Sequence, residues 1–578
     1  MPTLEWIGKD KVVNHHMEVP YRVLERRYTY NRETSENGII RGDNLEALKS
    51  LLPRYEGKIK CIYIDPPYNT GNEGWVYNDN VNDPQIKKWL GEVVGREGED
   101  LSRHDKWLCM MYPRLKLLQR LLAEDGAIFI SIDDNELYNL KAICDEIFGL
   151  NCFVSNVSWQ RTYSMRNDSK GIASEVEHIL VYGKQSAWNP NKLARTAEMD
   201  SKYKNPDNDP KGAWRNIVAS APNAITHQGM VYAIQNPLTG EYAYPPQGRC
   251  WSLGQEQMLA AMQQWCDYEL KDIGDDSKRA EVCNVSAEDV RKDVLAIVLK
   301  TPLEIAQKRA QEIYQHGTLP EFFFSQKGQG TLSRKAYINQ VSGRPVTNLW
   351  PFEETGHTDE ASRLLKSMFG GTAVFDTPKP PRLIERILQI AGDKDTLVLD
   401  SFAGSGTTAH AVLNMNKADG GHRKFILIEM MDYAESITAE RVRRVIDGYG
   451  TGKNAVPGTG GDFTFYDLGP VLLKADGNLN EDVGKEKIRE YVWFTETKQP
   501  IPAPKEDEPY YLGSYLDSAC YFYYERDRLT TLNRDFLHTV KTKAGQYIIY
   551  ADLCTLSDAE LERWHIVFKK IPRDISRL

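Results

Sequence analysis

Short apolar runs of strand length alternate with amphipathic segments of helix length over residues 1–158 of this chain. The runs Cys61–Asp65 and Gly126–Asp133 suit buried strands, and between them Lys106–Ala123 carries its apolar residues on one helical face. Pro113 inside that segment predicts a kink or a late helix start. Strands that alternate with helices favour a mostly parallel sheet with right-handed crossovers. The sequence therefore predicts an α/β fold.

This alternation stops near residue 159 and returns near residue 359. Residues 159–350 are instead rich in Asn, Pro, Gly and aromatic side chains, with helical patches predicted at Gln255–Leu270 and Ala287–Leu299. Farther on, helices and strands are again predicted in turn at Arg382–Ala391, Thr396–Asp400, Thr407–Asn416, Phe425–Glu429 and Ala434–Gly448. A domain inserted between two halves of one sheet explains the interruption most economically. We therefore predict a first core part (1–158), an insert (159–350), a second core part (351–450) and a C-terminal domain (451–578).

The composition narrows the class of protein. With 578 residues, the chain exceeds the size at which one hydrophobic core usually stops growing. It has no apolar run of about 18 residues, and Met1–Asp10 lacks the apolar segment of a secretory signal. Its nine cysteines include no CxxC pair, which indicates neither a zinc ribbon nor a dense disulfide framework. We expect a reduced, cytoplasmic protein.

The formal net charge of -9 is only a weak argument against a nucleic-acid partner. Phosphate contacts need a locally basic surface, which the total charge does not describe. Residues 159–215 carry ten Lys or Arg against seven Asp or Glu, interleaved with aromatic side chains. An ordinary solvated insert can have the same composition, so charge alone leaves both interpretations open.

The sharpest motif is Asp65-Pro66-Pro67-Tyr68, directly after a predicted strand. In open parallel sheets, ligands bind beyond the carboxyl ends of the strands. Each proline fixes its own φ and disfavours helix at the residue before it, so this turn is stiff. It combines a carboxylate, free carbonyl groups and an aromatic ring. The alternative is a purely structural turn at the strand exit.

Such a turn suits methylation of the amino group of adenine. That nitrogen is a poor nucleophile, because its lone pair is delocalised into the ring. The Asp65 side chain and the Pro66 carbonyl could accept its two hydrogens and stabilise the positive charge that develops on it. Tyr68 offers a face for stacking, and the base must leave the duplex before it can react. Asp65, Pro66, Pro67 and Tyr68 are therefore the predicted catalytic residues.

A glycine-rich loop, Leu399–Thr408, lies far downstream between a predicted strand and a predicted helix. Its glycines allow close approach of the backbone, and the helix N-terminus offers unpaired N–H groups to a carboxylate. Dinucleotide-binding enzymes share a GxG loop, but the third glycine of their fingerprint is missing here. Glu429 ends the next predicted strand, where an acid can accept hydrogen bonds from ribose hydroxyls. A solvated strand end is the alternative for Glu429.

These two motifs, with DPPY first and FAGSGTT later, resemble the β-group of DNA amino methyltransferases. Ser401 departs from that pattern, since Pro is common there. The segments that resemble more narrowly the modification (Mod) subunit of type III restriction–modification systems are Ile40–Leu48, Ile62–Asp79, His104–Leu122, Gly356–Gly370 and Val567–Ile575. The likeness covers nearly the whole chain except the insert. It implies a Rossmann-like methyltransferase core with circularly permuted motif order, an inserted target-recognition domain and a C-terminal accessory domain.

The resemblance also implies a cofactor, S-adenosyl-L-methionine, and roles for single residues. Asp43 would contact its adenine part, although a helix N-cap is the alternative. Lys379 and Pro380 would help hold its methionine end, although a lysine there can simply be solvated. The implied cofactor residues are Asp43, Lys379, Pro380, Asp400, Phe402, Ala403, Gly404, Ser405, Gly406, Thr407, Thr408 and Glu429. The substrate would be double-stranded DNA, and the implied partners are a second copy of the chain and a separate ATP-dependent restriction (Res) subunit.

Two other functions stay open. An amino methyltransferase could act on cytosine N4 or on a protein glutamine. Enzymes that act on cytosine usually have Ser before the prolines, and those that act on glutamine usually have Asn, so Asp65 favours adenine. A non-catalytic DNA-recognition subunit would need neither motif. Gly452-Lys453 lacks the flanking residues of a phosphate loop, and His104 and His357 belong to no metal-binding pattern. We expect neither an ATPase site nor a metal site.

Overall fold

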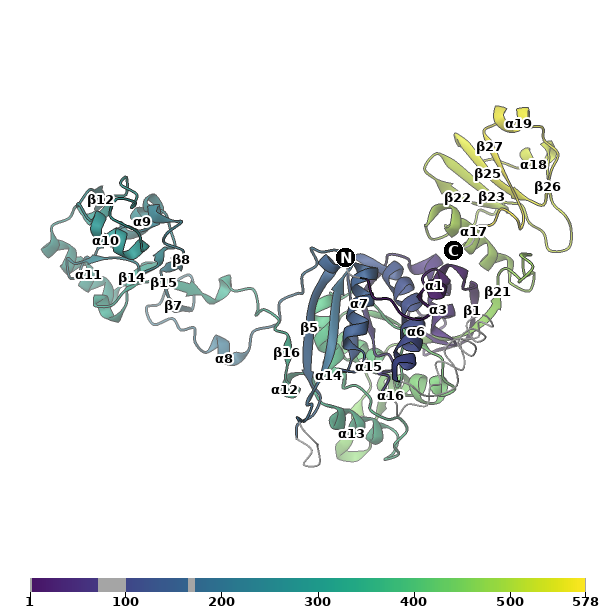
Figure 1. Cartoon of the computed structure of the whole chain (residues 1–578), viewed down its shortest axis with the longest axis horizontal. Helices are drawn as coiled ribbons and strands as arrows, with labels where there is room; N and C mark the ends of the chain where they lie inside the picture. Colours follow the sequence, from purple (N-terminus) through teal and green to yellow (C-terminus); the bar gives the residue numbers. More distant parts are fainter. Residues whose placement is uncertain (1–2, 71–99, 165–171, 577–578) are drawn as a thin grey trace. The chain divides into compact units, whose positions relative to one another are not determined.

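The computed structural model describes residues 3–70, 100–164 and 172–576, and it divides into two compact units (Figure 1). One unit joins Met1–Asn191 to Val346–Leu578, and the other is Lys192–Pro345. The smaller unit is thus an insertion into the larger one. The part of the segment Ile62–Asp79 from residue 71 onwards lies outside the described residues. The domain boundaries given above remain predictions.

Five parallel strands form the centre of a ten-stranded sheet in the larger unit. Their order is β2 (Gly38–Arg41), β18 (Lys424–Glu429), β17 (Leu397–Asp400), β3 (Ile59–Ile64) and β4 (Leu122–Ile132). β17 pairs in parallel with β3 on one side and with β18 on the other. Leu399 lies opposite Ile62, and Asp400 lies opposite Leu427, so these three strands end close together. The predicted α/β fold is confirmed, with strands from before and after the insertion in one sheet.

Both edges of this sheet contain antiparallel pairs. β6 (Val176–Gly183) pairs with β4 and with β5 (Phe153–Gln160), and β16 (Leu349–Trp350) follows in parallel to β5. At the other edge, β21 (Phe463–Val471) runs parallel to β2 and antiparallel to β1 (Arg22–Tyr30). The sheet therefore also draws strands from segments that the sequence groups with the insert and with the C-terminal domain.

Helices α3 (Asn44–Tyr55), α6 (Asp100–Leu121) and α7 (Leu137–Phe148) pack against one another and share a core with the sheet. α6 passes through Pro113 as one helix, so the prediction of a late start there is wrong. Proline removes a single backbone donor, and the fully buried Leu115 on the same helix contributes to the core that keeps it packed. A second group of packed helices consists of α14 (Pro381–Ala391), α15 (Thr407–Asp419) and α16 (Glu440–Asp447).

The unit Lys192–Pro345 has its own hydrophobic core, which includes Trp214, Trp251 and Trp265. Its elements include α9 (Gln255–Met262), β9 (Ile234–Gln235), β12 (Tyr268–Lys271) and β13 (Ala296–Leu299). The first predicted helical patch is confirmed only over α9, and the second is wrong, because its apolar end forms β13. A short apolar run fits a buried strand as well as a helix. β13 lies between β9 and β12, which supply its backbone hydrogen bonds.

The C-terminal part contains α17 (Lys485–Thr497) and a four-stranded sheet of β22 (Tyr511–Tyr515), β23 (Ser518–Phe522), β25 (Gln546–Ala551) and β27 (Ile566–Lys570). All nine cysteines of the chain are free thiols. Within the described ranges, no helix has both the length and the apolar character needed to cross a bilayer.

Candidate active site

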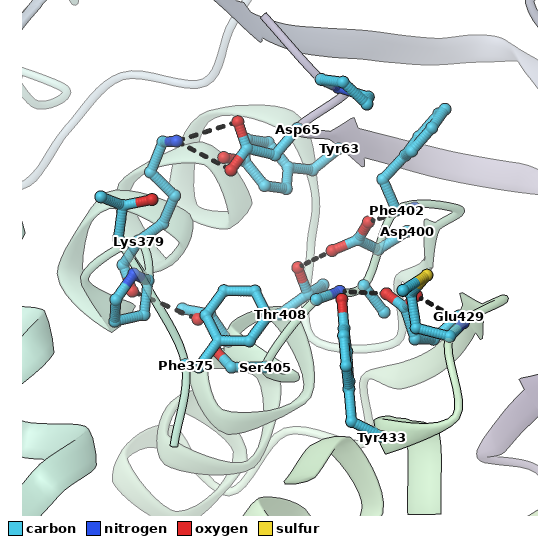
Figure 2. Close-up of a pocket in the computed structure, with 17 residues that line it drawn as sticks. Tyr63, Asp65, Phe375, Lys379, Asp400, Phe402, Ser405, Thr408, Glu429 and Tyr433 are labelled. Atoms are coloured by element: carbon cyan, nitrogen blue, oxygen red, sulfur yellow. Dashed lines mark hydrogen bonds and ion pairs between the residues drawn. The ribbon is translucent and has the colours of Figure 1, made fainter. Parts of the chain in front are cut away.

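Three chain segments meet at the carboxyl end of the parallel strands. Because β3, β17 and β18 are neighbours, the turn after β3, the loop after β17 and the acid that ends β18 come together. They border one cavity of about 280 Å³, whose lining residues are drawn in Figure 2. The predicted site residues that line it are Asp65, Pro67, Lys379, Asp400, Phe402, Ala403, Gly404, Ser405, Thr407, Thr408 and Glu429. The two main motifs therefore share one cavity.

The Asp65 carboxylate pairs with a lysine from a distant segment. Lys379 Nζ donates to both of its oxygens, at 2.9 Å to Oδ1 and 2.7 Å to Oδ2 (Figure 2). Tyr68 donates its hydroxyl to Oδ1 at 2.8 Å, and Lys379 Nζ lies 5.0 Å from the centre of the Tyr68 ring. The structure thus places the Lys379 ammonium at the predicted catalytic turn. The family resemblance, in contrast, implies a role for Lys379 at the methionine end of the cofactor.

A second carboxylate, the buried Glu177 on β6, completes this ionic cluster. Its Oε2 lies 3.1 Å from the Tyr68 hydroxyl oxygen and 3.5 Å from Lys379 Nζ, and its Oε1 accepts from Arg161 at 2.9 Å. Burial disfavours the Lys379 ammonium, but the attraction of Asp65 and Glu177 outweighs it, so the pKa of Lys379 lies above its usual value. The ammonium therefore stays charged between two carboxylates.

Side chains from α6 and its surroundings hold the turn from behind. The fully buried Trp107 donates its Nε1–H to the Pro67 carbonyl at 2.7 Å. Asn69, the residue after the motif, has a φ of 60°, which Asn tolerates better than most side chains, and it hydrogen-bonds to Glu136. Glu136 also lies 2.6 Å from His104 Nδ1, which gives His104 a structural contact. These contacts fix the backbone of the turn while the Asp65 side chain lines the cavity.

The loop after β17 has a backbone that its glycines permit. Gly404 has a φ of 50° and Gly406 a φ of 82°, both in the left-handed region. A β-carbon at Gly404 would lie 3.0 Å from the Phe375 ring, and one at Gly406 would lie 3.1 Å from the Thr438 carbonyl oxygen. Both positions therefore need glycine for conformation and for space. α15 begins directly after the loop, and its first residue, Thr407, lies in the cavity wall.

Two buried carboxylates hold this loop through neutral donors. Asp400 accepts from the Phe402 N–H at 3.1 Å and from the Thr408 hydroxyl at 2.6 Å. Glu429 accepts from the N–H groups of Gly404 at 2.8 Å and of Met431 at 3.0 Å. Burial raises the pKa of both carboxyls to about 7, although these hydrogen bonds oppose the rise. Both groups can therefore change protonation near neutral pH.

Some predicted residues do not line the cavity. Pro66, Tyr68, Pro380 and Gly406 belong to its turns without facing it. Asp43 caps α3 by accepting from the N–H groups of the first helical turn, at 2.9 and 3.1 Å, and its other oxygen lies 3.3 Å from Arg114. The structure thus shows the capping role of Asp43, and its contact with a cofactor remains a prediction.

Several side chains that line the cavity were not predicted from the sequence. The additional lining residues are Tyr63, Phe375, Thr377, Pro378, Met431 and Tyr433. Phe375 and Tyr433 meet edge to face, with their ring centres 5.6 Å apart. Their closeness to Lys379 and Glu429 in the sequence was the only available signal. Glu177 gave none, because β6 reaches the site only through its antiparallel pairing with β4.

Comparison with known proteins identifies relatives of this chain. Residues 59–440 match the DNA methylase family of N6 and N4 methyltransferases. The chain is 33% identical to the Mod subunit of the type III restriction–modification enzyme StyLTI from Salmonella typhimurium, over 73% of this chain and 57% of that protein. It is 30% identical to the EcoPI Mod subunit of Escherichia phage P1 (74% and 63%) and 30% identical to the type II methyltransferase M.KpnI of Klebsiella pneumoniae (69% and 81%). The matches to these two Mod subunits span less than two thirds of their length.

Proposed function

This chain belongs to the DNA methylase family of N6 and N4 methyltransferases, and we propose that it transfers a methyl group from S-adenosyl-L-methionine to the N6 amino group of adenine in duplex DNA. One observation carries the proposal. Asp65 and the loop Phe402–Thr408 border the same cavity, although they are far apart in the sequence. The acceptor for the amino hydrogens and the loop for the methyl donor are then close enough to act on one reaction.

The lining of the cavity suits the proposed cofactor. The Glu429 carboxylate is an acceptor for ribose hydroxyls, and the rings of Phe375 and Tyr433 offer apolar surface to a nucleoside. The glycine loop leaves room for the methionine part, which we assign to Phe402–Thr408. When bound, the cofactor supplies a methyl group on a positively charged sulfur. We keep Asp43 as a candidate for the adenine part and Pro380 for the methionine end.

Asp65 has the central role in the proposed reaction. Its carboxylate accepts an amino hydrogen of adenine and, with the Pro66 carbonyl as second acceptor, stabilises the positive charge that develops on the nitrogen. After transfer, that nitrogen carries one proton too many, and Asp65 is placed to accept it. The target base must leave the double helix to reach this turn.

Lys379 controls whether Asp65 is available. Both Asp65 oxygens accept hydrogen bonds from its ammonium, so an incoming amino group competes with the ammonium for this carboxylate. Glu177 offers the ammonium a second carboxylate 3.5 Å away. We infer that Lys379 holds the Asp65 side chain in place in the free enzyme and moves toward Glu177 when adenine binds. Glu177 would then be a positioning residue.

Labelled S-adenosyl-L-methionine and duplex DNA test the central proposal on the purified protein. We expect label in N6-methyladenine at defined sites, which methylation-aware sequencing would identify. Label confined to cytosine or to protein would reject the adenine assignment. Cofactor and DNA binding without any transfer would favour a non-catalytic recognition subunit.

We assign target recognition to the insert, which includes the unit Lys192–Pro345. The insert has basic residues that can contact phosphates, and its aromatic side chains Tyr163 and Tyr242 are exposed. Its buried tryptophans belong to the hydrophobic core of the unit Lys192–Pro345. Exchange of the unit Lys192–Pro345 for the corresponding unit of a relative leaves Glu177 and the large sheet intact and should change the methylated sequence. If the site choice survives the exchange, recognition lies elsewhere in the chain.

We further propose that the protein is the modification subunit of a type III restriction–modification system, that it forms a homodimer, and that it binds a separate ATP-dependent Res subunit. The similarity to two Mod subunits supports this assignment. Light scattering of the purified protein should give about twice the chain mass of 66.0 kDa. The alternative is a solitary methyltransferase, and the similarity to the type II methyltransferase M.KpnI supports it. Failure of the protein to copurify with a coexpressed Res subunit would favour this alternative.

A further inference from the structure

Arg441 on α16 is a fully buried cation behind the cavity wall. Its Nη1 donates to Ser405 Oγ and to Thr407 Oγ1, each at 2.7 Å, and its Nη2 lies 3.3 Å from His410 Nδ1. None of these partners is a carboxylate, and within the described part of the chain its Nε atom has no hydrogen-bond partner. A buried cation without a counter-charge is costly. The arrangement therefore calls for an anion from outside the chain.

The pKa values at this cluster agree with a missing counter-charge. Burial lowers the pKa of Arg441 to about 9. Burial, together with the charge of Arg441, also holds the pKa of His410 well below its usual range, so the imidazole is neutral and adds no second positive charge. An anion near the cluster would favour the charged guanidinium and remove part of this cost.

The hydroxyl groups carry the effect of Arg441 to the cavity. A hydroxyl that accepts a hydrogen bond from a guanidinium must direct its own hydrogen elsewhere. Thr407 directs it to the Lys379 carbonyl at 3.2 Å. Ser405 lines the cavity, and no acceptor for its hydrogen is found among the described residues. Ser405 therefore offers the cavity a donor that the buried cation polarises, next to the N-terminus of α15.

We propose that Arg441 is a positioning residue that selects a carboxylate at the Ser405 side of the cavity, namely that of the methionine part of the cofactor. The inference rests on the proposed function, because only the methionine part of that cofactor is an amino acid. Figure 2 shows Ser405 on the side of Lys379, with Glu429 on the opposite side. A carboxylate is attracted to the first side and repelled by Glu429 at the second, which fixes the direction of the ligand.

Two ligands separate this role from a structural one. S-adenosyl-L-homocysteine carries the carboxylate, and 5′-methylthioadenosine lacks the whole amino-acid part. By calorimetry on the full chain, Arg441→Met should weaken binding of S-adenosyl-L-homocysteine about tenfold or more, as a charge-assisted contact predicts. Binding of 5′-methylthioadenosine should change by less than about threefold. Arg443→Met, on the same helix but with its guanidinium bonded to the Tyr28 hydroxyl, is the matched control and should alter neither affinity.

Two further variants keep the test decisive if Arg441→Met does not give a cooperative thermal transition. Arg441→Lys keeps the charge and should retain more of the selectivity than the Met variant. Ser405→Ala leaves the cation in place, removes the donor, and should lose S-adenosyl-L-homocysteine affinity selectively. Equal losses for both ligands, or no loss in any variant, would overturn the inference. A wild-type protein that binds neither ligand would instead overturn the proposed function, which is a separate outcome.

Discussion

The two ends of the cavity hold their carboxylates in opposite ways. At the turn after β3, Asp65 pairs with the Lys379 ammonium and shares it with Glu177. At the loop after β17, Asp400 and Glu429 accept hydrogen bonds from backbone N–H groups and a hydroxyl. Burial accordingly raises the pKa of the latter two carboxyls to about 7, whereas the pKa of Lys379 at the first end stays above its usual value.

This difference matches two chemical tasks. In the proposed reaction, the ionic cluster is preorganised to stabilise positive charge on an amino nitrogen, because Lys379 and Tyr68 already orient its carboxylate. Carboxyls held by neutral donors can accept hydrogen bonds from uncharged ribose hydroxyls without disturbing an ion pair. Damage to one end should therefore leave the other end working.

The largest separation of the two ends is expected from Asp65→Ala. Loss of the acceptor should lower the rate of methyl transfer by a factor of about 100 to 1,000 or more. The affinity for S-adenosyl-L-homocysteine should stay within about threefold, because the glycine loop is untouched. Single-turnover transfer of labelled methyl groups and calorimetry measure the two quantities. Asp395→Ala, which alters an exposed carboxylate, is the control. An unchanged rate would remove Asp65 from the mechanism.

A smaller loss is expected from Glu177→Gln, which keeps the shape of the side chain and removes its charge. Lys379 would then have only Asp65 as a carboxylate partner, so release of Asp65 should become harder. We expect kcat to fall about 10-fold to 100-fold with cofactor affinity unchanged. Glu175→Gln, two residues earlier, is the matched control. If kcat and cofactor affinity fall together, or the rate is unchanged, Glu177 does not position Lys379.

The parts of the fold that could be predicted from sequence are those with strong local patterns. The strand predicted at Thr396–Asp400 is found at Leu397–Asp400, and the one at Phe425–Glu429 is found at Lys424–Glu429. Parallel strands that are buried on both faces have continuous apolar runs with clear ends in the sequence, which explains this agreement. The sequence predicts a helix over the strand Ala296–Leu299, because its apolar run is too short to distinguish the 3.6-residue repeat of a helix from the two-residue repeat of a strand.

The site divides in the same way. Motifs at strand ends identified Asp65 and the glycine loop as site residues, and the two border one cavity because the carboxyl ends of neighbouring parallel strands meet at one edge. The ion pair of Asp65 with Lys379 joins positions 314 residues apart and depends on how the chain is threaded through the sheet. No local pattern contains that information. The same reason explains why the sequence did not identify Glu177 or Arg441.

The pH dependence of cofactor binding should come from the loop end alone. With a pKa of about 7, the Glu429 carboxyl is mostly protonated at about pH 6 and mostly ionised at about pH 8. The ionised form accepts hydrogen bonds more strongly, so binding of S-adenosyl-L-homocysteine should strengthen as pH rises, by at most about tenfold per pH unit below the pKa. Glu429→Gln should flatten this dependence.

Calorimetry across that pH range provides the measurement. The Tyr433 hydroxyl hydrogen-bonds to Glu429 and lowers the pKa of that carboxyl, while the Asp400 carboxyl has a pKa of about 7 and titrates over the same range. Asp400→Asn therefore distinguishes the contribution of Asp400 from that of Glu429. A wild-type slope that persists in Glu429→Gln but disappears in Asp400→Asn would move the titrating group to Asp400. A slope that survives in both variants would show that the loop end is not its source.

The smallest expected effect is on stability, and it comes from Thr408→Val. Its hydroxyl donates to Asp400 at 2.6 Å, and valine has nearly the same shape. At about pH 8, Asp400 is ionised, so loss of the donor should lower the free energy of unfolding by about 1–3 kcal/mol. Below its folded-state pKa of about 7, Asp400 is mostly protonated and depends less on the donor, so the loss should shrink toward acid pH. Urea titrations at both pH values test the sign. An equal loss at both would mean that Asp400 does not titrate near neutrality, and the contrast between the two ends of the cavity would then lose one of its two carboxyls.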